Sequence, residues 1–250
     1  MTTIATQISN RQRSCTRHTP QTAKPLTRQL PLVLALLLSL TLIYSGSRLL
    51  LAGIASYQAQ AFLDDWGAKG QEPSTRAWLI AQDAAQRAVS LYPGSNGEYL
   101  ERLGRIQQWQ QFRQPFGAPQ ADASRRAALE TFRAASQARP TWPYNWTALA
   151  FAKLYLLEFD DEFAHALQQA KSLGPTRIEI NRTLAEIGFL AWPRLDDGQR
   201  SATLESARRT VAHSPREAQN LLALANRTGM DSQLCASLDA PLKDSRKICR

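Results

Sequence analysis

The sequence predicts an all-α protein in which one N-terminal transmembrane helix precedes a domain of stacked helical hairpins. Three observations lead to this prediction. Ala, Leu, Gln and Arg, which favour helices, are frequent, whereas alternating strand patterns are hard to find. A long apolar segment lies near the N-terminus, and a phrase ending in proline then recurs along the chain.

The formal net charge of +9 is concentrated in a basic tail, which we assign to residues 1–28. The residues after this tail carry a net charge of only +4, and their charges alternate in sign as they do on a solvated helix face. This pattern lacks the one-sided basic stripe that phosphate binding requires, so we predict no nucleic-acid partner. The basic residues of the tail are Arg11, Arg13, Arg17, Lys24 and Arg28.

Residues 29–55 are predicted to form a membrane anchor. The uncharged stretch between Arg28 and Arg48 would measure about 28 Å as a helix, close to the thickness of a bilayer core. Apolar residues continue past Arg48, whose side chain could reach back to the lipid head groups. Since the basic tail precedes this segment, the positive-inside rule places the N-terminus in the cytosol and the large domain across the membrane. A signal peptide cleaved near Ala59-Gln60-Ala61 is the alternative, and it would leave the compartment of the domain unchanged.

The cysteines fit this topology. Cys15 precedes the predicted anchor, whereas Cys235 and Cys249 both follow it and would face an oxidising compartment. We predict a disulfide between Cys235 and Cys249 that stabilises the fold by about 3 kcal/mol, and the alternative is two free thiols. No Cys/His cluster with metal-ligand spacing occurs, so we predict neither a metal nor another cofactor.

Residues 56–230 are predicted to form a repeat domain similar to tetratricopeptide repeats. A small residue precedes a proline by five positions in four copies, and the prolines are 47, 35 and 40 residues apart. Proline ends a helix because it lacks an amide donor and clashes with the preceding turn, so each copy marks a helix end. The pairs are Ala88 with Pro93, Ala135 with Pro140, Ala170 with Pro175 and Thr210 with Pro215.

Further small residues follow these prolines at a nearly constant distance, and they would let neighbouring helices approach closely. A loop is predicted around Gly117, and residues 231–250 are predicted to be an irregular C-terminal tail. Irregular helices without a true repeat stack are the alternative to this architecture. The small residues after the prolines are Gly104, Ala150, Ala185 and Ala225.

The sequence predicts a protein that is not an enzyme. It contains no phosphate-binding glycine loop, no metal-ligand cluster and no nucleophile elbow. The acidic residues Glu158 and Asp161 are the one pair that we consider as a candidate for sugar cleavage, which would need two carboxyl groups converging in a cleft.

Aromatic residues are concentrated between residues 139 and 146, close in sequence to those two acidic residues. Trp142 and Trp146 would share one face of a helix, with Tyr144 on another. Exposed, these rings could stack on sugars or anchor a partner protein, and with Glu158 and Asp161 they form our candidate binding patch. The alternative is that the tryptophans are core anchors between repeats.

The segment 139–192 resembles the VpsP family of exopolysaccharide biosynthesis accessory proteins. The resemblance depends on Arg139-Pro140-x-Trp142-Pro143-Tyr144-x-Trp146, Glu158-Phe159-Asp160-x-Glu162-Phe163, Ala166-Leu167, Leu173-Gly174-Pro175 and Ala191-Trp192. It implies a bacterial protein of the cytoplasmic membrane whose domain is periplasmic, beside the machinery that polymerises and exports a surface polysaccharide. It supplies no catalytic residues.

These observations lead to two functional hypotheses. The first is a non-catalytic, membrane-anchored scaffold whose stacked helices hold polysaccharide-assembly proteins together. The second is a carbohydrate-binding module of the same pathway, and a similar adaptor in another process of the cell envelope is a further alternative.

Overall fold

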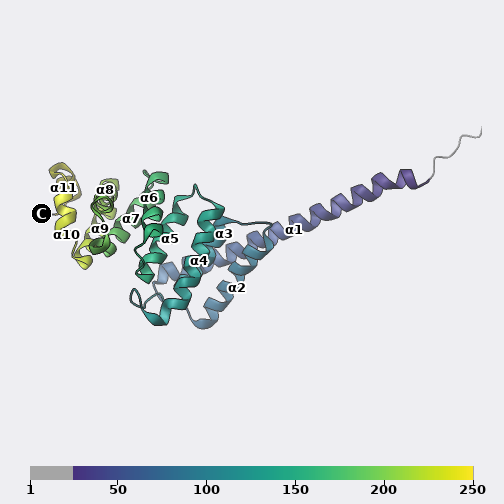
Figure 1. The fold of residues 1–250 in the computed structure, drawn as a ribbon, viewed down its shortest axis with the longest axis horizontal. Coiled ribbons are helices and arrows are strands. Elements are labelled where there is room, and N and C mark those ends of the chain that lie inside the picture. The colour runs from purple at the N-terminus through teal and green to yellow at the C-terminus, as the bar shows by residue number, and fades with distance from the viewer. Residues whose placement is uncertain (1–24, 250) are drawn as a thin grey trace, which may run out of the picture. The chain divides into compact units, whose positions relative to one another are not determined.

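The computed structural model describes residues 25–249, and every regular element in this part of the chain is a helix (Figure 1). The all-α prediction is therefore confirmed. The elements are α1 (Pro25–Lys69), α2 (Thr75–Leu91), α3 (Gly97–Trp109), η1 (Pro119–Ala121), α4 (Asp122–Ala138), α5 (Pro143–Leu156), α6 (Asp161–Leu173), α7 (Ile178–Ala191), η2 (Trp192–Arg194), α8 (Asp197–His213), α9 (Pro215–Thr228), α10 (Asp231–Ser237) and α11 (Ala240–Arg246), where η denotes a single turn of 3₁₀-helix.

The chain divides into two compact units, one up to Gly46 and the other from Ser47 onward. In the first unit, α1 exposes large apolar side chains such as Leu32, Leu36 and Ile43. By length and composition, α1 can cross a membrane. The predicted basic tail lies outside the described residues except for its last four, which begin α1.

Residues 47–55, the last part of the predicted anchor, belong to the second compact unit. Ala52 and Ala55 are 0% and 4% exposed, and they belong to the second unit. Arg48 also belongs to this unit, where its guanidinium donates a hydrogen bond to the Ser90 carbonyl (2.8 Å). Hydropathy does not separate residues 29–46 from residues 47–55, because both stretches of α1 are rich in apolar residues.

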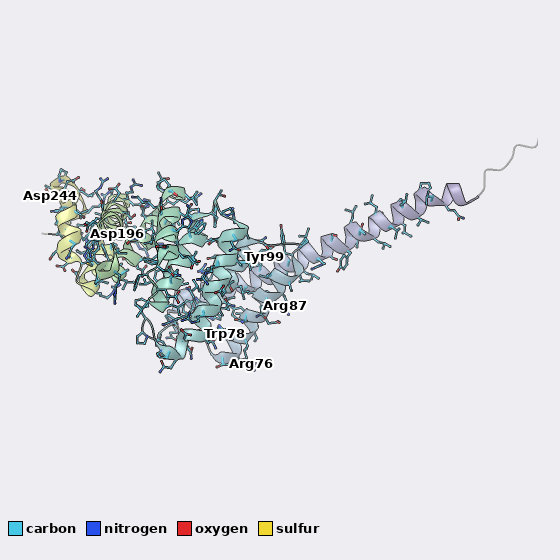
Figure 2. All side chains as sticks on the ribbon, in the orientation of Figure 1. Arg76, Trp78, Arg87, Tyr99, Asp196 and Asp244 are labelled. Carbon is cyan, nitrogen blue, oxygen red and sulfur yellow. A yellow bond between two sulfur atoms is a disulfide. The ribbon has the colours of Figure 1, made fainter. Side chains whose placement is uncertain are left out.

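The last part of α1 forms a hydrophobic cluster with α2 and α3. Leu63 and Trp66 of α1 are buried there together with Ala85 of α2 and Ile106 of α3. Trp78 of α2, labelled in Figure 2, donates its indole N–H to the Ile106 carbonyl (2.8 Å). The domain therefore begins within α1, and its first helix is not separated from the apolar segment by a loop.

The four repeated prolines mark helix ends, as predicted. Each lies two residues beyond the last residue of α2, α4, α6 or α8. In the first three copies the residue after the helix donates its amide to the carbonyl of the small residue, with distances of 3.3 Å to Ala88, 3.0 Å to Ala135 and 3.1 Å to Ala170. These small residues are also buried, so each one both accepts the hydrogen bond at the helix end and lies in the packed interior.

The small residues after the prolines permit close helix packing. Ala150, Ala185 and Ala225 are completely buried. At Gly104 of α3, a β-carbon would lie 2.6 Å from the Phe132 ring of α4, so only glycine fits there. Gly188 of α7 has a similar role, since a β-carbon at this position would be 2.1 Å from the Thr203 hydroxyl of α8.

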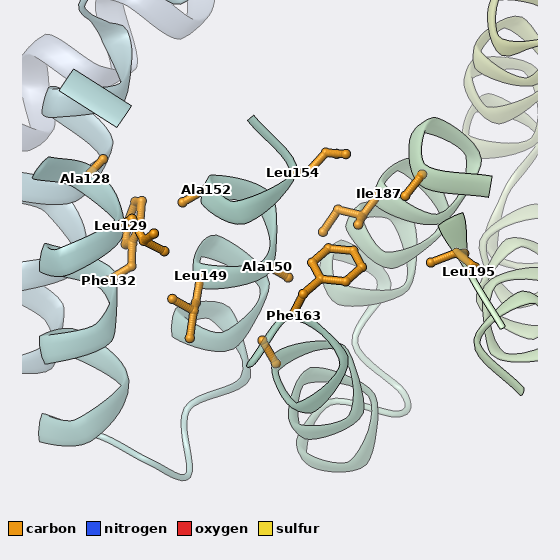
Figure 3. Close-up of a cluster of buried hydrophobic side chains, with 12 residues drawn as sticks. Ala128, Leu129, Phe132, Leu149, Ala150, Ala152, Leu154, Phe163, Ile187 and Leu195 are labelled. Carbon is orange, nitrogen blue, oxygen red and sulfur yellow. The ribbon is translucent and has the colours of Figure 1, made fainter. Parts of the chain in front are cut away.

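Consecutive helices pack side by side from α2 to α9 and form the predicted stack of helical hairpins (Figure 1). Figure 3 shows the central core, in which Leu129 and Phe132 of α4 face Leu149 of α5. Phe163 of α6 lies between α5 and Ile187 of α7 in the same cluster. Each hairpin thus shares its core with the next, as stacked repeats require.

The prediction of an irregular tail after residue 230 is wrong. Residues 231–246 contain α10 and α11. Leu234 of α10, together with Leu238 between the two helices and Ile248 after α11, completes a hydrophobic cluster with α8 and α9. A disulfide joins Cys235 and Cys249 (2.00 Å), the pair that the sequence analysis proposed. Helices of seven residues span only two turns, which is too short for a periodic pattern to be visible.

Candidate functional site

The five residues of the predicted binding patch do not form one site. Trp142 and Tyr144 lie at the start of α5, whereas Glu158 and Asp161 follow its end. A helix of 14 residues is about 21 Å long, so the two groups lie at opposite ends of it. The start and the end of α5 are therefore two separate candidate sites.

At the start of α5, Trp142 pairs with Tyr144 and not, as predicted, with Trp146. Trp142 is the N-cap residue and lies outside the helix, with φ −99° and ψ 107°. This backbone conformation turns its indole toward the Tyr144 ring, and the two ring centroids are 5.2 Å apart. Both rings are half-buried.

Two arginines contact this aromatic pair. The Arg139 guanidinium carbon lies 3.8 Å from the Trp142 ring centroid. Arg177, in the next proline turn, lies 5.4 Å from the Trp142 ring and 5.8 Å from the Tyr144 ring. Tyr144 also donates its hydroxyl to the Glu179 carboxylate (3.3 Å). We call Arg139, Trp142, Tyr144 and Arg177 the arginine–tryptophan surface.

Close packing beneath this surface holds Arg139 in place. A β-carbon on Gly97, the first residue of α3, would lie 2.7 Å from the Arg139 β-carbon and 3.2 Å from the Asn145 amide nitrogen. Asn145 is completely buried and donates to the Ala135 carbonyl (2.8 Å). The arginine–tryptophan surface is therefore supported by the end of α4 and the start of α3.

Trp146 is a core anchor, which was the alternative considered for the tryptophans. Its indole N–H donates to the Pro140 carbonyl (2.7 Å), and its ring packs against two buried clusters. The His165 ring meets it edge-on at 5.3 Å. Trp146 thus fixes the turn between α4 and α5, and its role differs from that of Trp142.

At the other end of α5 the central residue is Lys153, which the sequence analysis did not single out. Its side chain is only 1% exposed, and its ammonium group contacts three carboxylates. The Nζ distances are 2.8 Å to Asp160, 2.8 Å to Glu162 and 3.3 Å to Glu158. Burying an ammonium group is costly unless it is paired, and Lys153 meets this condition fully.

Arginines from α4 complete the ion-pair network around Lys153. Arg133 donates from Nε and Nη2 to the two Glu162 oxygens, at 2.7 Å and 2.6 Å. Arg126 contacts Glu158 at 3.1 Å. The network therefore joins α4, the end of α5 and the start of α6.

The network also holds an unusual turn. Leu157 ends α5 in the left-handed region with φ 59°, a conformation that costs a residue other than glycine about 1 kcal/mol. The Glu158 amide donates to the Lys153 carbonyl (3.0 Å), and Asp160 accepts the Phe163 amide (3.0 Å) and begins α6. The conspicuous acidic segment 158–162 is thus used to build a helix–turn–helix junction.

The electrostatic effects in this network agree with ion pairing. The hydrogen bonds from Arg133 lower the pKa of Glu162 from 4.5 to about 2, with a further contribution from Lys153. Burial alone would lower the pKa of Lys153, but the hydrogen bonds with Asp160 and Glu162 outweigh it and raise this pKa. All of these groups are therefore charged at neutral pH.

The acidic pair considered for catalysis has no shared cleft. Glu158 is engaged by Lys153 and Arg126, and Asp161 is an exposed residue at the first position of α6. Within residues 25–249, no group of three His, Cys, Asp or Glu side chains is placed to hold a metal ion. The arrangement supports binding and packing, and these two carboxylates are not placed to act together as acid and base.

Two hollows lie elsewhere on the domain. One, of about 320 Å³, separates α6 from α8, with Leu167 and Leu184 on its apolar side and Gln168 and Gln199 on its polar rim. The other, of about 270 Å³, lies between the end of α3 and the end of α5 beside Trp109 and Tyr155. Neither contains a residue of the predicted patch.

The sequence matches no protein-family model, and it matches no curated protein. The resemblance to the VpsP family therefore remains a prediction.

Proposed function

We propose that this chain is a non-catalytic, membrane-anchored scaffold that assists the biosynthesis, polymerisation or export of a bacterial exopolysaccharide. The observation that carries the proposal is the architecture, in which a stack of hairpins follows one apolar helix. Stacked helical hairpins commonly present extended surfaces to partner proteins. The pathway comes from the sequence resemblance alone.

Two further features support a scaffold. The most acidic segment of the domain is neutralised internally by Lys153, Arg126 and Arg133, which suits a structural role. The positive-inside rule places the domain across the cytoplasmic membrane, and the disulfide suits an oxidising compartment such as the periplasm. The proposed partners are membrane proteins that assemble the polysaccharide.

A deletion strain and crosslinking in living cells test this proposal. We expect deletion to reduce the amount or length of surface polysaccharide and crosslinking to recover polysaccharide-assembly proteins. A strain with unchanged polymer would contradict the pathway, and recovery of other envelope proteins would indicate an adaptor in a different process. A reporter enzyme fused to the C-terminus that is active only in the cytosol would contradict the topology.

A carbohydrate-binding module is the second candidate, since Trp142 and Tyr144 are half-exposed aromatic rings. One observation weighs against it. Arg139 already lies 3.8 Å from the Trp142 ring and occupies a face on which a sugar would stack. If sugars do bind there, Trp142→Ala should abolish the binding of isolated polysaccharide to the purified chain without unfolding it.

A further inference from the structure

The arginine–tryptophan surface contains two cations without an anionic partner. Neither Arg139 nor Arg177 forms an ion pair within 4 Å in the described part of the chain, and both guanidinium groups lie against aromatic rings. Glu179 is nearby, and its carboxylate accepts a hydrogen bond from the Tyr144 hydroxyl. At the opposite end of α5, by contrast, every cation of the Lys153 network contacts at least one carboxylate.

A third arginine reaches the same turns. Arg209 of α8 donates to the Pro175 carbonyl and pairs with Glu205 at 2.8 Å. The proline turns therefore present three guanidinium groups, of which one is neutralised by a carboxylate. The three arginines outnumber the nearby carboxylates Glu179 and Glu205, so the local charge is positive and complements an acidic ligand.

The aromatic contacts leave the guanidinium groups able to bind. A guanidinium that lies over a ring uses its face, while its N–H donors point outward in its own plane. Those in-plane donors match the two oxygens of a carboxylate. Because Trp142 already holds Arg139 in one position, less side-chain entropy is lost when a carboxylate binds.

The composition of this surface indicates a protein ligand. Trp, Tyr and Arg are the residue types most enriched among the energetically dominant residues of protein interfaces. Neither of the two hollows described above is lined by a residue of this surface. The exposed residues Thr141 and Thr176 border it in the two proline turns.

We propose that the arginine–tryptophan surface docks an acidic segment of a partner protein, whose carboxylates pair with Arg139 and Arg177. This inference rests on the proposed scaffold function and specifies the chemistry of one partner. Trp142 and Tyr144 act as positioning residues for the two guanidinium groups and add apolar contact area.

Photo-crosslinking in living cells tests this assignment with the full chain. A photoreactive amino acid is placed at Thr141 or Thr176, and the attached peptides are identified by mass spectrometry. A third position, Gln168, lies at the rim of the hollow between α6 and α8 and reports on scaffold contacts elsewhere. We expect adducts at positions 141 and 176 with partner peptides that contain at least two acidic residues close together.

Three double variants make the test specific. We expect R139Q/R177Q to reduce these adducts at least fivefold, and R139K/R177K to reduce them similarly, because lysine keeps the charge but loses the planar fork. The control R76Q/R216Q removes the same charge from two exposed arginines elsewhere and should leave the adducts unchanged. Circular dichroism of each variant establishes that the helices are intact.

Several results would overturn the inference. Adducts that persist in R139Q/R177Q, or that contain saccharide or peptides without acidic residues, would show that carboxylate pairing with a protein is not the basis of contact. Adducts from position 168 but none from 141 or 176 would refute this docking surface and leave the scaffold proposal standing. Absence of adducts from all three positions would contradict both.

Discussion

The two ends of α5 use charge in opposite ways. At its C-terminal end, Lys153 is buried among three carboxylates, and arginines from α4 neutralise two of these further. At its N-terminal end, Arg139 and Arg177 lie on aromatic rings and have no carboxylate partner within the described residues. Within the described residues, the charges at one end of α5 are therefore paired with opposite charges, whereas the two arginines at the other end are not.

This difference separates charges with a structural role from charges that are available for binding. A satisfied network gains little from any ligand, whereas it loses much stability when one of its members is removed. Unpaired exposed cations contribute little to stability and remain available to bind. Variants at the two ends of α5 should consequently differ in what they impair, and four predictions test this comparison.

The largest effect is expected for Lys153→Ala. Removing the buried ammonium group leaves Glu158, Asp160 and Glu162 facing one another, and breaking a buried ion pair in this way costs about 3 to 5 kcal/mol. The measurement is denaturant unfolding of the detergent-purified chain, followed by circular dichroism. A loss below about 1 kcal/mol would show that the network is not structural.

The next largest loss of stability is expected for Trp146→Ala, and it should exceed the loss for Trp142→Ala. Trp146→Ala removes a ring packed against two clusters and its hydrogen bond to Pro140, so we expect a loss of about 3 kcal/mol. Trp142→Ala removes a half-buried ring and its cation–π contacts, for a loss of about 1 kcal/mol. Equal losses in the same unfolding assay would contradict the distinction that we draw between the two.

Lowering the pH should reduce the stability that the Lys153 network contributes, gradually and by less than the tryptophan substitutions do. Since pairing with Arg133 lowers the pKa of Glu162 from 4.5 to about 2, its stabilisation is complete above pH 4.5 and is lost as the pH falls toward 2. Glu162→Gln should therefore reduce the pH dependence of stability in this interval. Unfolding curves measured between pH 2 and pH 7 test this expectation.

Glu186→Gln is a control of opposite sign for that experiment. Burial raises the pKa of Glu186, so its charge destabilises the folded state at neutral pH and protonation relieves this as the pH falls. We expect Glu186→Gln to increase stability most near pH 7. Parallel shifts for both variants would show that the local partners do not determine the pH dependence.

The smallest effect on stability is expected for R139Q/R177Q. Neither side chain pairs with a carboxylate within the described residues, so we expect only the loss of their cation–π contacts, less than about 1 kcal/mol, while partner crosslinking is lost. The same unfolding assay measures it. A loss comparable to that of Lys153→Ala would mean that the two ends of α5 are both structural, and the comparison would fail.

The parts of the fold that could be predicted depend on local signals. Proline fixes a helix end within its own turn, so Pro140 and Pro175 marked α4 and α6 correctly. Ala150 and Ala185 indicated close packing because they recur at the repeat spacing. The division of α1 at Ser47 was not predicted, because the burial of Leu63 and Trp66 depends on helices later in the chain.

The candidate site was predicted only in part, for a similar reason. Trp142 and Tyr144 were identified because aromatic residues are concentrated in their segment. Their partner Arg177 lies 35 residues after Trp142, and the stacking of repeats brings it to the Trp142 ring. That relation was readable in principle, since Arg139 and Arg177 flank consecutive prolines of the repeat. The contact between Arg133 and Glu162 joins two helices without any periodic signal and could not have been found in this way.

The C-terminal disulfide has a consequence for how the array ends. A stack of hairpins exposes an apolar edge at its last repeat, onto which another copy could add, and α10 and α11 cover that edge here. The disulfide between Cys235 and Cys249 links α10 to the residues that follow α11. Arg246 also connects α11 to α8 by donating a hydrogen bond to the Val211 carbonyl (3.0 Å). Reducing agents should therefore promote head-to-tail oligomers before they unfold the helices, and light scattering of the purified chain would register such growth.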